Sequence, residues 1–148
     1  MVSAAGGMVK AAVLAAALAG VFMGCFWHSY GRLARTHVEL LTALARKGAD
    51  LVANGRLTAE TMPELTYPLE RAQAFASQAR ASAGDAPPAS LVAFDTLVAR
   101  YREFVDALDR VRREQSGADA RAALGPPLAA VETAGDGVRA ALRAEGRG

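Results

Sequence analysis

Reactive side chains are few in this chain, and two of them lie close together. The only cysteine, Cys25, stands three residues before His28, one of the two histidines. On a helix this spacing puts a thiol and an imidazole on one face, where both could bind a metal ion. A tetrahedral site needs two more ligands, and no further ligand lies nearby in the sequence. We therefore predict that the protein holds no metal.

No other pattern typical of a catalytic site occurs. The sequence lacks the GxxxxGK[ST] and GxGxxG loops that bind nucleotide phosphates, and the Glu-x-x-His pairs of di-iron bundles. A single cysteine excludes haem attachment through CxxCH as well as an internal disulfide. Carboxylates on the expected helices lie mostly beside arginines or on polar faces, as do Glu39, Asp95 and Glu132. We predict from this that the protein is not an enzyme and needs no cofactor.

Cys25 is also a candidate for lipid attachment. If translation starts at Met8, the chain begins MVKAAVLAAALAGVFMGC, with a short basic start, an apolar centre and a Gly-Cys pair. This layout resembles a bacterial lipoprotein signal, and VFMGC loosely resembles a lipobox. The lipobox prefers leucine at the third position before the cysteine and a small residue at the second, where this chain has Phe22 and Met23. The resemblance implies lipidation of Cys25, and the two departures count against it.

The same segment has the length and composition of a membrane helix. From Ala11 to Gly31 there is no lysine, arginine, aspartate or glutamate. As a helix these residues span about 31 Å, close to the thickness of the hydrocarbon core of a bilayer. Alanine is nearly neutral for insertion, so the larger apolar side chains supply only about −3 kcal/mol. The segment is a marginal membrane helix, and marginal N-terminal segments are also typical of signal peptides.

The residues that follow the segment favour an uncleaved helix. Tryptophan and tyrosine collect at the membrane–water boundary, and arginines just beyond it reach the phosphate headgroups. We predict these positions for Trp27, Tyr30, Arg32 and Arg35. Residues 1–31 are thus predicted to be an N-terminal membrane anchor, and a lipoprotein signal or a cleaved secretory signal are the alternatives left open.

Small residues recur every four positions along the predicted anchor, at Ala12, Ala16, Gly20 and Gly24. A face of small residues lets two membrane helices approach closely, so that dispersion and weak Cα–H contacts hold them together. We interpret these four residues as a candidate docking face for another membrane protein or for a second copy of this chain. Membrane lipid and such a membrane protein are therefore the partners that we expect.

The remaining residues carry a balanced charge. Of the 17 basic and 15 acidic residues only Lys10 lies within residues 1–31, which leaves 16 basic and 15 acidic side chains for the rest. A nucleic-acid-binding protein would normally show a net basic stripe, so we expect no nucleic-acid partner. All basic residues except Lys10 and Lys47 are arginine, and alanine is abundant, as in proteins from GC-rich bacterial genomes.

Residues 32–148 show the spacing of helices and no strand pattern. A first helix is predicted over about 33–52; it could continue directly from the anchor, because Gly31 alone is a weak breaker. A second is predicted to begin with a capping box at 61–64 and to be interrupted at Tyr67-Pro68. It should end before the GDAPP loop, residues 84–88.

A third helix has the clearest pattern, with a broad apolar face and charged pairs at i,i+4 on the opposite face, such as Arg102–Asp106, Asp106–Arg110 and Asp109–Arg113. A fourth is predicted to start at Gly125-Pro126-Pro127, after a short alanine-rich turn. Short loops between helices predict an all-α fold: an antiparallel up-and-down bundle of about four helices over residues 32–148. The apolar face of the third helix consists of Leu91, Phe94, Leu97, Val98, Tyr101, Phe104, Val105, Leu108 and Val111.

These features predict a structural or accessory interaction subunit anchored in a bacterial inner membrane, with the bundle in the periplasm. The alternative is a periplasmic lipoprotein or a detached sensor-type bundle that binds a ligand or partner. Its layout resembles the helical sensor domains that follow a first membrane helix in bacterial receptors, although the sequence has no second membrane segment. It is also similar to phage-type spanins in its anchor and helical body, but six prolines favour a compact bundle over a long rod.

Overall fold

Four helices account for nearly all of the chain in the computed structural model, which describes residues 3–114 and 117–148, apart from the side chains of residues 3–7, 22 and 23. They are α1 (Ser3–Ala53), α2 (Pro63–Ala83), α3 (Ala89–Glu114) and α4 (Gly117–Ala144). The described residues include no strand. The all-α prediction is confirmed.

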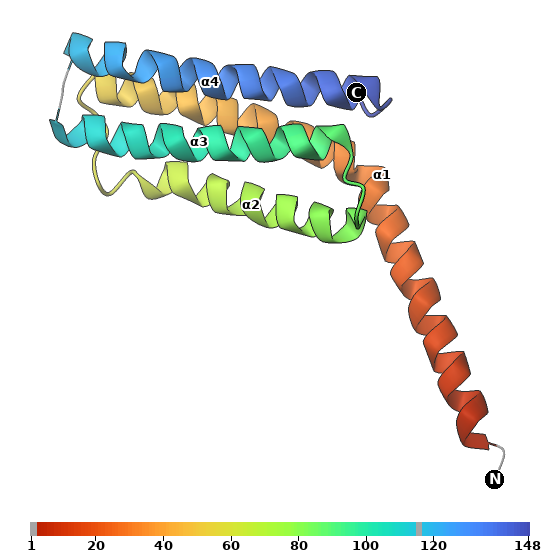
Figure 1. Cartoon of the computed structure of the whole chain (residues 1–148). Coiled ribbons are helices and arrows are strands. Elements are labelled where there is room, and N and C mark those ends of the chain that lie inside the picture. The colour runs from red at the N-terminus through yellow and green to blue at the C-terminus, as the bar shows by residue number, and fades with distance from the viewer. Residues whose placement is uncertain (1–2, 115–116) are drawn as a thin grey trace.

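The helices run up and down in an antiparallel bundle (Figure 1). α1 and α3 contact each other and both remaining helices, while α2 and α4 lie on opposite sides of this pair. Each connection joins neighbouring helices, so the predicted topology is confirmed as well. One end of the bundle holds the loop between α1 and α2; the other holds the loop between α2 and α3 and the end of α4 (Figure 1).

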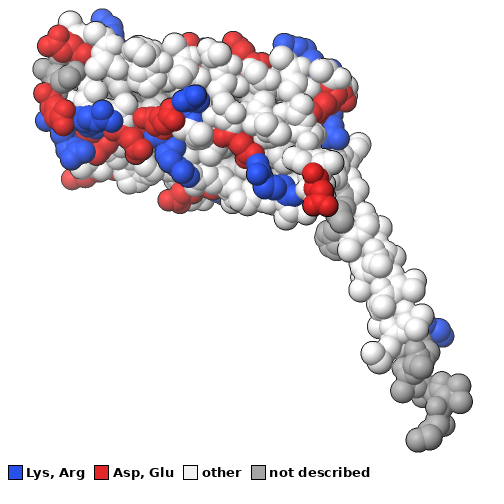
Figure 2. Space-filling view, in the orientation of Figure 1, with Lys and Arg blue, Asp and Glu red and all other residues white. Residues whose placement is uncertain are grey.

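α1 is much longer than the bundle and projects from it. The helix continues through Gly31, so the predicted anchor and the first bundle helix are one element. This continuity agrees with the expectation that a single glycine is a weak helix breaker. We call residues 8–25 of α1 the arm, because the side chains described there are all exposed. In the face that Figure 2 shows, the described part of the arm has almost no charged atoms, whereas charges of both signs are mixed over the bundle.

The apolar face predicted for the third helix forms the centre of the core. All nine of its residues are buried in α3. The hydroxyl of Tyr101 donates a hydrogen bond to the backbone carbonyl of Leu65 at 2.9 Å, and burial raises the pKa of this phenol far above its ordinary value. Tyr101 is therefore a core residue, as its place on the apolar face indicates.

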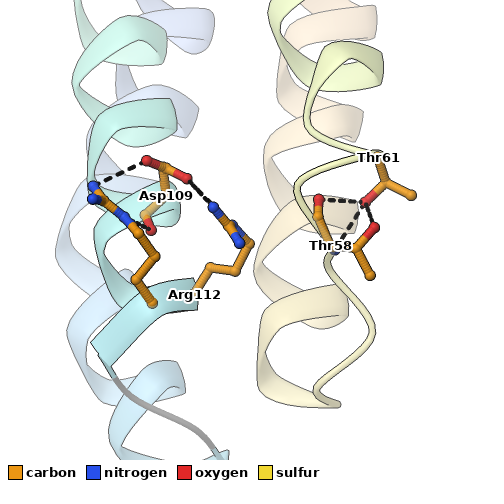
Figure 3. Close-up of polar contacts among 5 residues, drawn as sticks. Thr58, Thr61, Asp109 and Arg112 are labelled. Carbon is orange, nitrogen blue, oxygen red and sulfur yellow. Dashed lines mark hydrogen bonds and ion pairs between the residues drawn. The ribbon is translucent and has the colours of Figure 1, made fainter.

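The start of α2 differs from the prediction. Thr61 does not cap the helix: its hydroxyl oxygen accepts the N–H of Thr58 and bonds back to the Thr58 carbonyl, both at 3.0 Å (Figure 3). Glu64 instead lies 3.6 Å from Lys47 of α1. The prediction of a capping box is wrong, because the Thr61 side chain bonds to the backbone of Thr58 in the preceding loop. Met62 is the N-cap residue instead, and it makes no side-chain hydrogen bond there.

Prolines inside helices also depart from the prediction. α2 continues through Pro68, because Leu65 and Leu69 on either side are buried against the bundle. α4 continues through Pro126 and Pro127, so the fourth helix begins at Gly117. The two carbonyls that lose their N–H donors belong to exposed alanines, where water can bond them, and packing of Ala120 and Leu124 holds the first turns in place.

The charged face of α3 is only partly as predicted. Asp109 pairs with Arg113 at 3.1 Å and with Arg112 at 2.7 Å (Figure 3), and the hydrogen bond from Arg112 holds the pKa of this carboxyl below its ordinary value. Among the described residues, Asp106 forms neither of its two predicted pairs. These side chains are exposed, and each such pair stabilises a helix by only a few tenths of a kcal/mol, so their pairing has little effect on the fold.

Candidate functional site

The arm leaves the bundle through a cluster of aromatic rings. We call Phe26, Trp27, Tyr30 and Gly31 of α1 the arm root. The Tyr30 ring stacks on Phe75 of α2 with centroids 5.7 Å apart, and Phe26 lies 6.1 Å from the same ring. These contacts tie the arm root to α2, so the direction of the arm depends on aromatic packing.

A polar network lies next to these rings. The Ser90 hydroxyl donates to Oε2 of Glu145 at 2.7 Å, and the Ser90 backbone N–H donates to Oε1 of the same carboxylate at 2.8 Å. Tyr30 lies 3.1 Å from the Ser90 hydroxyl oxygen, and because Ser90 gives its single proton to Glu145, the tyrosine is the donor. The network joins the arm root, the first turn of α3 and the tail after α4, and Glu145 places a negative charge at a helix N-terminus, where it is favourable.

Arg147 of the tail covers the arm root. Its guanidinium lies over the rings of Trp27, at 5.1 Å, and of Tyr30, at 5.3 Å. The tail comes so close to α1 that a Cβ on Gly31 would stand 2.8 Å from the Arg147 carbonyl oxygen. Glycine is therefore required at residue 31 by this contact, a role that its place in the sequence does not reveal.

Replacing Glu145 with alanine should destabilise the bundle by about 1.5–3 kcal/mol, because two Ser90 donors lose a charged acceptor. The unfolding midpoint in guanidinium chloride, followed by circular dichroism, measures this loss. Glu70→Ala serves as the control, since Glu70 is an exposed carboxylate on α2. Equal midpoints for the two variants would show that the network contributes nothing to stability.

No protein-family model, curated protein or solved structure matches the chain.

Among the residues that the structure describes, no group of three or more histidine, cysteine or acidic side chains could hold a metal ion. One helix, α1, is long and apolar enough to span a membrane or to be a signal sequence.

The residues predicted for the anchor differ in how far the bundle covers them. Cys25 and the four small residues of the docking face are exposed on the arm, and none of the described atoms lies within 4 Å of a Cβ built on Gly20 or Gly24. Arg32 and Arg35 are exposed on the part of α1 that follows the arm root, and Trp27 is half-buried. The side chains of Phe22 and Met23, which bear on the lipobox, lie outside the described residues.

The prediction for Tyr30 has to be corrected. Its ring is fully buried and its hydroxyl is bonded to Ser90, so the side chain is not available to lipid. An aromatic residue beside a membrane segment is typical of both a boundary position and a core position. Only the arrival of α2 and α3 on one side of α1 decides between them.

His37 lies in the same aromatic region as Tyr30, seven residues further along α1. Its ring centroid is 5.0 Å from that of Phe75 and 5.9 Å from that of Phe94, and its Nδ1 is buried without a hydrogen-bond partner. Burial, with a smaller effect of the Arg71 charge, lowers the pKa of this imidazole below its ordinary value. Burial in this region therefore favours the neutral form of His37 in the folded protein.

The free energy of unfolding should fall as the pH drops below about 6.5, the ordinary pKa of histidine. Between that value and the lower pKa of folded His37, the unfolded chain binds a proton that the folded chain does not. The stabilisation is complete above this window and lost below it. Denaturant midpoints at a series of pH values test this: His37→Gln should flatten the dependence in this window, whereas His28→Gln, which changes an exposed histidine of α1, should keep it.

Proposed function

We propose that this protein is a non-enzymatic, membrane-anchored helical bundle that acts as a structural or accessory interaction subunit at a bacterial membrane. The observation that carries the proposal is that α1 has two halves in one unbroken helix. Its second half is packed in the bundle, whereas Val13, Leu14, Leu18 and Val21 of its first half are exposed. An uncovered apolar helix of this length is unfavourable in water, and a bilayer would cover it.

We propose the inner membrane as the location and the periplasm as the side on which the bundle stands. The continuous helix would then hold the bundle directly at the membrane surface without a flexible tether. Protease added to spheroplasts should degrade the bundle, and protection of the bundle until the membrane is broken would contradict this orientation.

The face of small residues on the arm supports a docking role. In the part of the chain that the structure describes, Gly20 and Gly24 have no neighbour in the bundle that explains the lack of a side chain. Close approach of another membrane helix would explain it. The partner is therefore proposed to be another membrane protein or a second copy of this chain.

The double variant Gly20→Leu, Gly24→Leu should lose the membrane proteins that copurify with the chain in mild detergent, because leucine side chains hold two helices apart. A matched control is Ala15→Leu, Ala19→Leu, which changes residues at the same spacing on another face of the arm. Quantitative mass spectrometry of the copurified proteins measures the difference. A full partner set in the glycine variant, or an equal loss in the control, would show that docking does not use this face.

A further inference from the structure

A pocket of about 320 Å³ lies beside the arm root. Its wall comes from the arm root itself, from the end of α2 with the loop after it, and from the tail after α4, which meet at one end of the bundle (Figure 1). In an anchored protein this end faces the membrane–water boundary, so the inference rests on the proposed anchoring. The lining residues are Trp27, Ser82, Ala83, Ala86, Pro88 and Arg147.

The lining combines apolar surface with one cation. Trp27, Pro88 and the two alanines offer contact to hydrocarbon, while Arg147 brings a positive charge held over the Trp27 ring. Stacking on an aromatic face fixes the plane of a guanidinium and leaves its edge to bind an oxyanion. The pocket is therefore suited to a molecule that is both apolar and anionic at one point.

Arg147 has hydrogen-bonding capacity to spare. Its Nε atom lies 3.9 Å from Oε2 of Glu145, beyond hydrogen-bond distance, and both oxygens of that carboxylate accept hydrogen bonds from Ser90. Among the described residues, the buried Nη1 atom of Arg147 has no hydrogen-bond partner, while the side chain as a whole is 34% exposed and lines the pocket. The accessible part of this guanidinium can bind a carboxylate or a phosphate strongly, and the phosphate is the oxyanion that a phospholipid surface supplies.

We propose that this pocket binds the phosphate headgroup of a membrane phospholipid. The phosphate lies on the guanidinium of Arg147, the glycerol region packs against Trp27 and Pro88, and the acyl chains follow the exposed apolar surface of the arm. Glu145 offsets part of the charge of Arg147, so zwitterionic phospholipids fit as well as anionic ones. The tail would thereby fix the bundle at a set height above the bilayer.

The test uses the full chain, purified in mild detergent and transferred to an amphipol. Trp27 is the only tryptophan, so its fluorescence reports directly on the pocket. Three probes are titrated: dihexanoylphosphatidylcholine, dihexanoylglycerol, which has the chains but no phosphate, and inorganic phosphate, which has no chains. We expect saturable binding of the phospholipid alone.

Two variants alter the pocket in different ways. Arg147→Gln removes the charge, and Ala86→Phe fills part of the pocket without adding a tryptophan. Each should raise the Kd for the phospholipid at least tenfold. Arg143→Gln is the matched control, because Arg143 is an exposed arginine one turn earlier on the chain and does not line this pocket. Its Kd should stay within about twofold of the parent.

Several outcomes would overturn the proposal. Equal binding of the phosphate-free lipid would show that Arg147 does not bind the phosphate. Equal binding of inorganic phosphate would show that the pocket is a site for a soluble anion. A loss of phospholipid affinity in Arg143→Gln as large as in Arg147→Gln would indicate general electrostatic attraction to arginines. If no probe binds, the pocket does not bind phospholipid. Because the titration is done outside a bilayer, it can fail while the chain still fractionates with membranes, which separates this inference from the proposed anchoring.

Discussion

The double variant Leu14→Arg, Leu18→Arg should leave the membrane fraction. Both leucines are exposed on the arm, so the bundle loses no packing when they change. Each replacement raises the free energy of membrane insertion by about 3 kcal/mol, and the parent segment has only about −3 kcal/mol in its favour. The balance thus reverses to about +3 kcal/mol, which favours the uninserted state by roughly a hundredfold. Carbonate extraction of membranes, followed by immunoblotting, measures the change.

The matched control is Leu33→Arg, Leu40→Arg. These leucines lie on the bundle half of the same helix and are 38% and 43% exposed, so the chain gains the same charge outside the arm. The control should stay in the membrane fraction. If both double variants fractionate alike, the arm is not the anchor.

The intact mass of the membrane-bound protein tests the lipoprotein alternative in the same preparation. An anchor that stays whole gives the mass of the unprocessed chain. A mass that begins at Cys25 and carries acyl chains, and that disappears in Cys25→Ser, would replace the membrane helix with a lipid.

Replacing Phe94 with alanine should cost about 3–5 kcal/mol of folding stability, the usual loss for a large aromatic side chain in a packed core. Phe94 is fully buried, and its ring meets Phe75 edge to face at 5.2 Å. A small domain has only about 5–15 kcal/mol in total, so roughly a fifth or more of its stability is at risk. The guanidinium midpoint of the full chain in mild detergent should fall, with an unchanged slope if unfolding stays cooperative.

Val92→Ala is the control for this prediction. Val92 lies two residues away on α3 and is exposed, so its truncation should change the free energy of unfolding by less than about 0.5 kcal/mol. A Phe94 variant as stable as this control would mean that the cluster between α1, α2 and α3 is not packed as described.

The local patterns that worked were those with one strong physical cause. The apolar residues of α3 recur at three and four positions because one face of a helix must be buried, and all of them lie in the core. The GDAPP loop ends α2 because Gly84 takes a positive φ and two prolines follow. Such signals need no knowledge of what the helix packs against.

The patterns that failed depend on neighbours. Pro126 and Pro127 read as the start of a helix, yet α4 runs through them because Ala120 and Leu124 are already held in the core. The threonine of the apparent capping box bonds to a residue three positions earlier instead. In both cases a weak local preference yields to packing or to a competing bond of similar strength.

The candidate site shows the same division. The sequence by itself determined an apolar, nearly uncharged arm and a helical bundle with an apolar interior, because hydrophobic length and spacing are properties of a single segment. Only the tertiary structure decided that Tyr30 is buried, that Ser90 and Glu145 bond to each other, and that Arg147 lies over Trp27. These residues are more than fifty positions apart along the chain, and no local spacing records a contact that exists only once α1, α3 and the tail have packed together.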